Sequence, residues 1–203
     1  MSIVSTLNIR SEHHNSCEDS LYVKETPVSI SGGVFDGCSR GKKSHWASQS
    51  FAYVFERYFN PCDYYSIKDA MLRLNSMANI LGIDQEHFLS TCILFFYDKV
   101  TKQLQVRIFG DGFYYVNHVE YEVDQKNEPD YIGYKVLNLY DIDEYLKKYP
   151  IETYYDVTNF KICSDGLKSF DISQFETSEI KDPVALLFTA PASKNYLQRM
   201  WNK

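Results

Sequence analysis

The chain has 203 residues and a formal net charge of −6, and 44% of its residues are hydrophobic while 24% are charged. This length and composition are typical of one globular domain, here expected over residues 1–203, and exclude both disorder and a coiled coil. The acidic charge gives no general support for a nucleic-acid or anionic-membrane partner, because those ligands attract basic surfaces.

The first elements are predicted to be strands. Residues 3–10 and 20–24 have strand-like patterns and are separated by a polar segment rich in Ser, His and Asn. The run 27–43 begins as an alternating strand and ends in Gly, Ser and Lys, as expected where the backbone leaves a sheet. Asp36 stands at that exit.

Two amphipathic helices are predicted next. Between Ser44 and Phe59 the apolar residues recur at spacings of three and four, which indicates one buried helix face. Residues 66–81 repeat this pattern, with Ser66 as the start signal and Gly82 as the end.

The rest of the chain is strand-rich. Strands are predicted at 90–98, 103–111, 112–123 and 133–140, followed by a short helix at 141–148, a strand at 158–166, a helical stretch at 171–180 and a strand at 184–190. Short polar turns between the strands imply antiparallel neighbours. This order predicts an α+β domain of antiparallel sheets covered by helices, rather than βαβ units around a parallel sheet.

Acidic residues stand at or just beyond the ends of the predicted strands. They fall in 18-ED-19, 35-FDG-37, 110-GDG-112 and 164-SDG-166, and at Asp182 before the last strand. Any one Asp-Gly pair is typical of a turn. Here apolar residues come directly before the motifs, so the carboxylates could meet where buried strands end. Packed carboxylates repel one another unless a cation is present, and ligands that are all oxygen favour Mg²⁺ or Mn²⁺.

The order of these motifs, from about Asn8 to Ala190, resembles that of the metal-dependent type 2C protein phosphatases. In particular, 33-GVFDGCSRGKKSHWAS-48 is similar to a bacterial branch in which the Asp-Gly motif continues into the first helix. The resemblance implies a β-sandwich of two antiparallel sheets flanked by helices on both outer faces (αββα).

The same resemblance implies a site for two Mn²⁺ or Mg²⁺ ions, with a third at a weaker site. Asp36 would bridge the two ions. The other ligands that it assigns are Glu18 and the carbonyl of Gly37 for the second metal, and Asp165 and Asp182 for the first.

Two further acidic residues have implied roles. Asp19 matches the position that orients metal-bound water, and Asp111 matches a ligand that shares the third metal with Asp165. In such a site a hydroxide shared by two cations attacks phosphorus, so no protein nucleophile is required. The five cysteines lack the phosphate-cradling loop of a tyrosine phosphatase.

The sequence departs from the family beside the metal site. Cys38 stands where some members have a histidine that donates a proton, and His45 is another candidate for that role, although a histidine at a helix start is typical of a surface. His14 replaces an arginine that grips phosphate in many relatives. His13, His14 and Arg10 are therefore the candidate phosphate-binding residues, and His14 joins Asp19 and Asp36 as a candidate catalytic residue. A histidine pair in a polar loop is equally typical of a solvated surface.

The expected function is hydrolysis of phosphoserine or phosphothreonine in a phosphorylated protein substrate, in a bacterial or phage context. One alternative is a weakly active or inactive family member that serves as a signalling or partner-binding module, and another is a small-molecule phosphatase. Retention of the carboxylates favours an enzyme.

The remaining expectations concern the compartment and partners. The five cysteines include no CxxC pair, which argues against a disulfide framework or a zinc site. No segment has the roughly 18 apolar residues of a membrane span. We therefore expect a cytoplasmic monomer with no membrane and no nucleic-acid partner.

Overall fold

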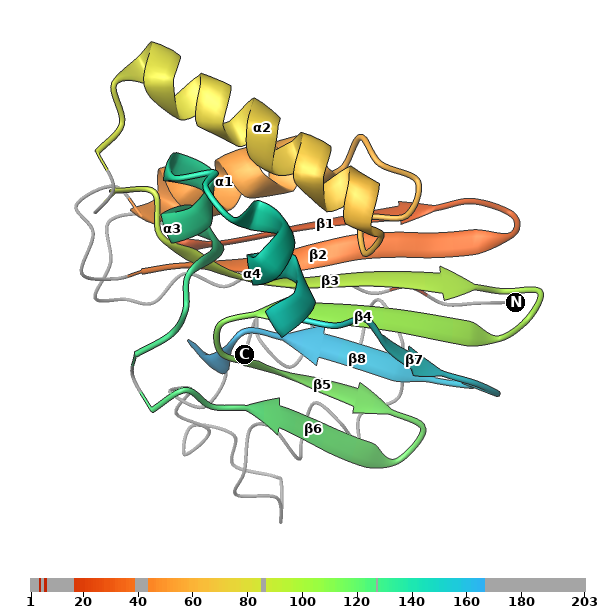
Figure 1. Cartoon of the computed structure of the whole chain (residues 1–203). Coiled ribbons are helices and arrows are strands. Elements are labelled where there is room, and N and C mark those ends of the chain that lie inside the picture. Colours follow the sequence, from red (N-terminus) through yellow and green to blue (C-terminus); the bar gives the residue numbers. More distant parts are fainter. Residues whose placement is uncertain are drawn as a thin grey trace.

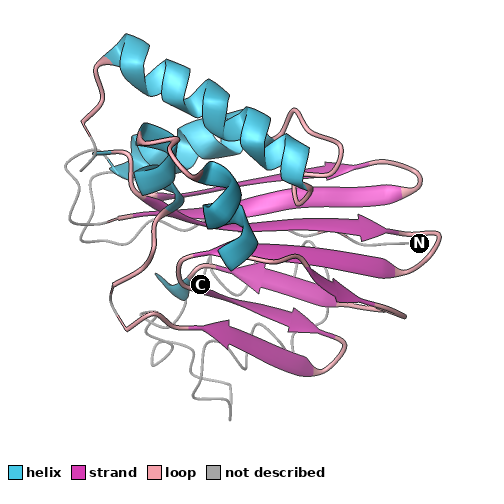
Figure 2. Ribbon diagram, in the orientation of Figure 1, coloured by secondary structure: helices cyan, strands magenta, loops and turns pink. Residues whose placement is uncertain are grey.

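The computed structural model describes residues 4, 6, 17–38, 44–84, 87–126 and 128–166. Within these residues the chain forms two antiparallel sheets, one of which is covered by helices (Figures 1 and 2). This is the predicted α+β class. The predicted helix at 171–180, the predicted strand at 184–190 and all but two residues of the predicted strand 3–10 lie outside the described residues.

The larger sheet has the strand order β1-β2-β3-β4-β7 in the described part of the chain. Its strands are β1 (Asp19–Glu25), β2 (Ser29–Gly37), β3 (Ser90–Asp98), β4 (Gln103–Phe109) and β7 (Glu152–Tyr154). The predicted strands 20–24, 90–98 and 103–111, and the strand predicted at the start of 27–43, correspond to four of these, whereas β7 was not predicted from the sequence.

The smaller sheet has the order β6-β5-β8, again counted over the described residues. Its strands are β5 (Gly112–Val116), β6 (Val119–Val123) and β8 (Phe160–Cys163). The two sheets pack face to face, since Phe95 of β3 lies 5.3 Å from Phe160 of β8 between ring centroids, within a buried cluster that includes Leu104 and Val116. The chain is therefore a β-sandwich.

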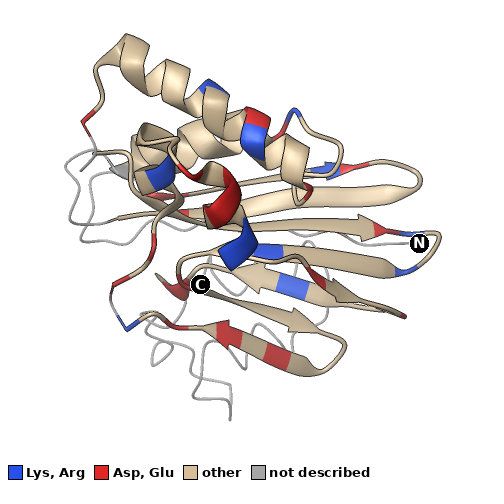
Figure 3. Cartoon of the chain, in the orientation of Figure 1, with Lys and Arg blue, Asp and Glu red and all other residues tan. Residues whose placement is uncertain are grey.

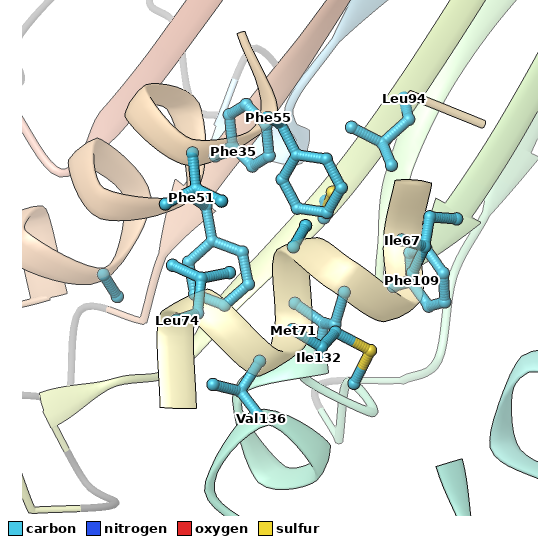
Figure 4. Close-up of a cluster of buried hydrophobic side chains, with 14 of the residues drawn as sticks. Phe35, Phe51, Phe55, Ile67, Met71, Leu74, Leu94, Phe109, Ile132 and Val136 are labelled. Atoms are coloured by element: carbon cyan, nitrogen blue, oxygen red, sulfur yellow. The ribbon is translucent and has the colours of Figure 1, made fainter. Parts of the chain in front are cut away.

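The described helices cover the outer face of the larger sheet (Figure 1). They are α1 (Ser44–Phe55), α2 (Tyr64–Leu81), α3 (Ile132–Leu137) and α4 (Ile142–Lys148). Phe35 of β2 contacts both Phe51 and Phe55 of α1, at ring-centroid distances of 6.3 and 5.9 Å (Figure 4). The aromatic side chains thus join the first helix to the strand that ends at Asp36. In the described part of the chain, each helix is too short or too polar to traverse a bilayer.

Helix α2 begins two residues before its predicted start. Asp63 is the N-cap, and its carboxylate accepts hydrogen bonds from the Ser66 amide at 2.9 Å and the Ser66 hydroxyl at 2.5 Å. The predicted end is confirmed, because Gly82 has the left-handed conformation at φ 60°.

Asp63→Ala is expected to lower the free energy of unfolding by about 1 kcal/mol, because it removes the cap of the longest described helix. Urea unfolding measures the change. Ser76→Ala on the exposed face of α2 is the control and should cost less than about 0.5 kcal/mol. Equal losses in the two variants would contradict the capping role.

Two strand predictions were wrong. Residues 133–140 were predicted as a strand, but 132–137 form α3 because Ile132 and Val136, four residues apart, are both buried against the helical core. Residues 112–123 were predicted as one strand but form the β5–β6 hairpin, which turns at Asn117 and His118 with φ values of 53° and 135°. A tyrosine-rich run without a Gly or Pro at the turn conceals the hairpin in the sequence. The first predicted helix, 44–59, ends at Phe55.

Candidate metal centre

The pairing of β1 with β2 brings two predicted site residues opposite one another. Asp19 is the register partner of Asp36. The backbone carbonyl of Glu18 accepts a hydrogen bond from the Gly37 amide at 3.1 Å, so the pairing extends one residue past the strand. The acidic pair in 18-ED-19 and the Asp-Gly pair in β2 therefore share one edge of the larger sheet.

The 110-GDG-112 motif is the corner at which the chain leaves β4 and enters β5 of the other sheet. Gly110 has φ 87°, and a Cβ there would lie 2.8 Å from Cγ2 of Thr91. A Cβ on Gly112 would lie 2.5 Å from Cδ1 of Ile93. Both positions lack room for a side chain, and Gly110 also needs a conformation that other residues rarely adopt. The corner places Asp111 at the same end of the sandwich as Asp36.

Strand β8 brings the last described carboxylate to this end. β8 is antiparallel to β5, with Cys163 opposite Phe113, so that Ser164 and Asp165 emerge beside the start of β5. The Ser164 hydroxyl donates a hydrogen bond of 2.9 Å to Oδ2 of Asp19. This contact joins the two sheets, and Figure 3 shows acidic residues at this end of the sandwich.

The electrostatics of the site follow from this crowding. Part of the Asp36 surface is exposed, but protein atoms surround the carboxyl on most sides. Burial raises the pKa of Asp36 well above its usual range, and a hydrogen bond with Asp165 and the charge of Asp19 raise it further. Burial also raises the pKa of Asp19, although hydrogen bonds with Asp36 and Ser164 oppose that shift. The crowding of these carboxyls therefore disfavours their charged forms.

The donor set fits a hard divalent cation. Asp19, Asp36, Asp165, Glu18 and the carbonyl of Gly37 offer oxygen only, which suits Mg²⁺ or Mn²⁺. A multivalent cation would relieve the repulsion among these carboxylates. As the side chains stand, no three or more His, Cys, Asp or Glu residues of the described ranges form a ready coordination group. The strand pairing nevertheless brings Asp19, Asp36 and Asp165 to one edge of the sandwich.

Other predicted site residues have contacts of their own or lie outside the described residues. The Asp111 side chain, 8% exposed, accepts a hydrogen bond of 2.6 Å from the Gln125 amide and so anchors the segment after β6. His45 lies in the first turn of α1 with its ring edge-on to Trp46. The predicted residues Arg10, His13, His14 and Asp182 lie outside the described residues.

Two residues of the site were not predicted. Ser164 could have been noticed, because it stands inside the 164-SDG-166 motif. Tyr131 had no such signal, since it precedes a segment that was predicted as a strand. Its hydroxyl lies beside the Cys38 thiol. Burial, the polar interaction with Cys38 and the nearby charges of Cys38 and Asp36 raise the pKa of Tyr131 far above its usual range, so its hydroxyl stays protonated.

Comparison with known proteins places the fold. No family model matches the sequence, and no curated protein matches it. Solved structures do match. RsbX in complex with magnesium is 15% identical with a TM-score of 0.59, covering 93% of this chain and 87% of its own. The serine/threonine phosphatase Stp1 from Staphylococcus aureus is 16% identical with a TM-score of 0.58, covering 100% and 91%.

A third match is the PP2C (type 2C) phosphatase domain, with a fragment of the regulatory domain, of SpoIIE from Bacillus subtilis. It is 16% identical with a TM-score of 0.52, covering 89% of this chain and 48% of that one. The predicted type 2C fold is thus confirmed.

Proposed function

Because the chain has the fold of the bacterial type 2C serine phosphatases, we propose that it is a metal-dependent phosphomonoester hydrolase acting on phosphoserine or phosphothreonine in proteins. The observation that carries this proposal is the meeting of Asp19, Asp36 and Asp165, drawn from both sheets, at one edge of the sandwich. Burying several like charges together destabilises a folded protein, so a cluster of this kind marks a candidate functional site.

Each residue has a distinct task in this proposal. Asp36, between the other two carboxyls, would hold both Mn²⁺ or Mg²⁺ ions, with Glu18 and the Gly37 carbonyl on one side and Asp165 on the other. Asp182 would complete the set. When bound, the cations would neutralise charge on the phosphoryl oxygens and lower the pKa of the attacking water.

Asp19 acts on that water rather than on the substrate. The Ser164 hydroxyl donates to Oδ2 of Asp19 at 2.9 Å and so holds this carboxylate in place, from where it would orient the attacking water toward phosphorus. The position of Asp19 opposite Asp36 in the β1–β2 register supports this task. Preorganisation by a neighbouring strand needs no movement during the reaction.

Metal removal is the direct test. With Mn²⁺ in excess the protein should hydrolyse an aryl phosphate, and EDTA should reduce the rate by at least about 100-fold because the attacking water loses its activation. At 100 times the dissociation constant, Mn²⁺ should add about 2.7 kcal/mol of stability and raise the Tm by about 5–10 °C. Turnover that persists in EDTA would overturn the mechanism.

A comparison of kcat/KM values for different phosphomonoesters would identify the substrate class. Phosphoserine and phosphothreonine peptides should be hydrolysed with higher kcat/KM than small phosphorylated metabolites at equal concentration. A preference for metabolites would replace the protein phosphatase by a small-molecule phosphatase. Stoichiometric Mn²⁺ binding with no turnover of any phosphomonoester would instead assign the chain to a partner-binding module.

A further inference from the structure

We propose that the Tyr131 hydroxyl is a phosphate-binding group of this site, and that it donates a hydrogen bond to an oxygen of the bound phosphomonoester beside Asp36. The inference deepens the proposed function and rests on it for the identity of the substrate. It assigns a phosphate contact to a residue between β6 and α3.

The segment that carries Tyr131 lies across the ends of the strands that form the site. On one side, a Cβ on Gly110 would stand 3.5 Å from Cβ of Pro129. On the other, Gly133 lies so close to Phe88 that a Cβ would stand 1.8 Å from the Phe88 carbonyl oxygen. The next residue, Leu89, accepts a hydrogen bond of 3.1 Å from the Cys38 amide. Residues 129–133 are therefore seated against the corner that holds Asp111 and against Phe88 and Leu89, the second of which bonds to the segment after Asp36.

The same segment is fastened at several points. Asp111 accepts a hydrogen bond from the Gln125 amide at 2.6 Å, and the Gln125 side chain accepts one from the Asp130 amide at 2.5 Å. The Asp130 carboxylate in turn accepts from Lys148 of α4 at 2.7 Å and from the Tyr149 hydroxyl. These bonds fix the backbone directly before Tyr131.

The Tyr131 ring is also held. Its amide donates to the Pro129 carbonyl at 2.9 Å, and its ring packs edge-on against Tyr134 with centroids 5.8 Å apart. A hydroxyl on a rigid ring loses little entropy when it binds a ligand, which makes it an effective positioning group.

The present partner of the hydroxyl is easily replaced. The Tyr131 hydroxyl lies beside the Cys38 thiol, and a thiol is a weak donor and a weak acceptor. A phosphoryl oxygen, which carries negative charge, is a much stronger acceptor. The neutral hydroxyl can turn from sulfur to phosphate without leaving a strong partner behind, and it adds no charge that would repel the substrate.

The test measures phosphate binding directly, so that it does not depend on turnover. Inorganic phosphate is titrated by calorimetry into the Mn²⁺-loaded full chain. Tyr131→Phe keeps the ring and its contact with Tyr134 but removes the hydroxyl. Phosphate should bind the variant about 10- to 100-fold more weakly, the range expected for loss of a hydrogen bond to a charged group. Mn²⁺ affinity and the urea midpoint should stay unchanged.

Two matched variants separate phosphate contact from a structural role. Tyr134→Phe removes the hydroxyl of the neighbouring tyrosine and should bind phosphate like the wild type. Cys38→Ala removes the thiol partner and should do the same. If Cys38→Ala weakens phosphate as much as Tyr131→Phe does, the hydroxyl only fixes the Cys38 segment and the inference is wrong.

Kinetics give an independent readout. For an aryl phosphate, Tyr131→Phe should raise KM more than it lowers kcat, because a contact to a phosphoryl oxygen is present in both ground and transition states. Wild-type protein that binds phosphate but shows no metal-dependent turnover would overturn the proposed function and leave the Tyr131 contact standing. Unchanged phosphate affinity in Tyr131→Phe, or no phosphate binding by the Mn²⁺-loaded wild type, would overturn the contact itself.

Discussion

Asp36→Asn is expected to reduce Mn²⁺-dependent hydrolysis of an aryl phosphate by on the order of 10³-fold or more, since bound metal lowers the activation barrier by several kcal/mol. The carboxyl lies between Asp19 and Asp165, and all three are drawn together by strand pairing and by β8. An amide offers one neutral oxygen and cannot hold two cations. The readout is steady-state turnover at saturating Mn²⁺.

The thermal stability of metal-free Asp36→Asn, in contrast to its activity, should not decrease. In metal-free protein, Asp36→Asn removes a crowded carboxyl, so its Tm should equal or exceed that of the wild type, while the gain on adding Mn²⁺ should disappear. Asp143→Asn, which replaces a surface partner of Lys68, is the control and should retain both turnover and the Mn²⁺ response. An unchanged rate of aryl phosphate hydrolysis in Asp36→Asn would contradict the assignment of a metal centre.

Gly133→Ala is expected to cost about 3 kcal/mol or more of unfolding free energy, at the upper end of the range for overpacking a buried site. The new Cβ would stand 1.8 Å from the Phe88 carbonyl oxygen. The helix cannot move away easily, because Ile132 and Val136 on either side are fully buried. Urea unfolding provides the measurement.

A second glycine serves as a control that separates steric overlap from backbone strain. Gly82 has the left-handed conformation with φ 60°, but a Cβ there would meet no atom within 4 Å. Gly82→Ala should therefore cost only about 1 kcal/mol, through backbone strain alone. If Gly133→Ala cost no more than Gly82→Ala, the close approach of α3 to the Phe88 backbone would not constrain the fold.

The sequence was sufficient where structure follows from local pattern. The apolar spacing of α2 predicted its buried face, which includes Ile67 and Leu74, and Gly82 marked its end. The start was missed because Asp63 and Ser66 are both good start signals, and only the backbone shows which one caps. The strand prediction for residues 133–140 was wrong for a different reason. Apolar and polar residues alternate there, whereas the burial of Ile132 and Val136 in the helical core depends on elements far away in the chain.

The same distinction between local pattern and distant contact applies to the candidate site. Strand ends identified Asp36 and Asp165 as candidates, but the sequence did not fix the register that sets Asp19 opposite Asp36. Tyr131 was out of reach, because its place beside Cys38 depends on how the segment before α3 crosses the strand ends. A motif can indicate a carboxylate at a strand end, whereas a contact between distant loops requires the fold.

The hydrogen bond from Ser164 to Asp19 has a consequence for how the sandwich opens. Among the described residues β8 is an edge strand of only four residues, and Ser164, which directly follows it, bonds to Asp19 of β1 in the opposite layer at 2.9 Å. A ligand bound at this edge would contact both layers, so ligand binding and local unfolding of β8 would be linked through one equilibrium. In that case the ligand would also stabilise the packing of one sheet on the other.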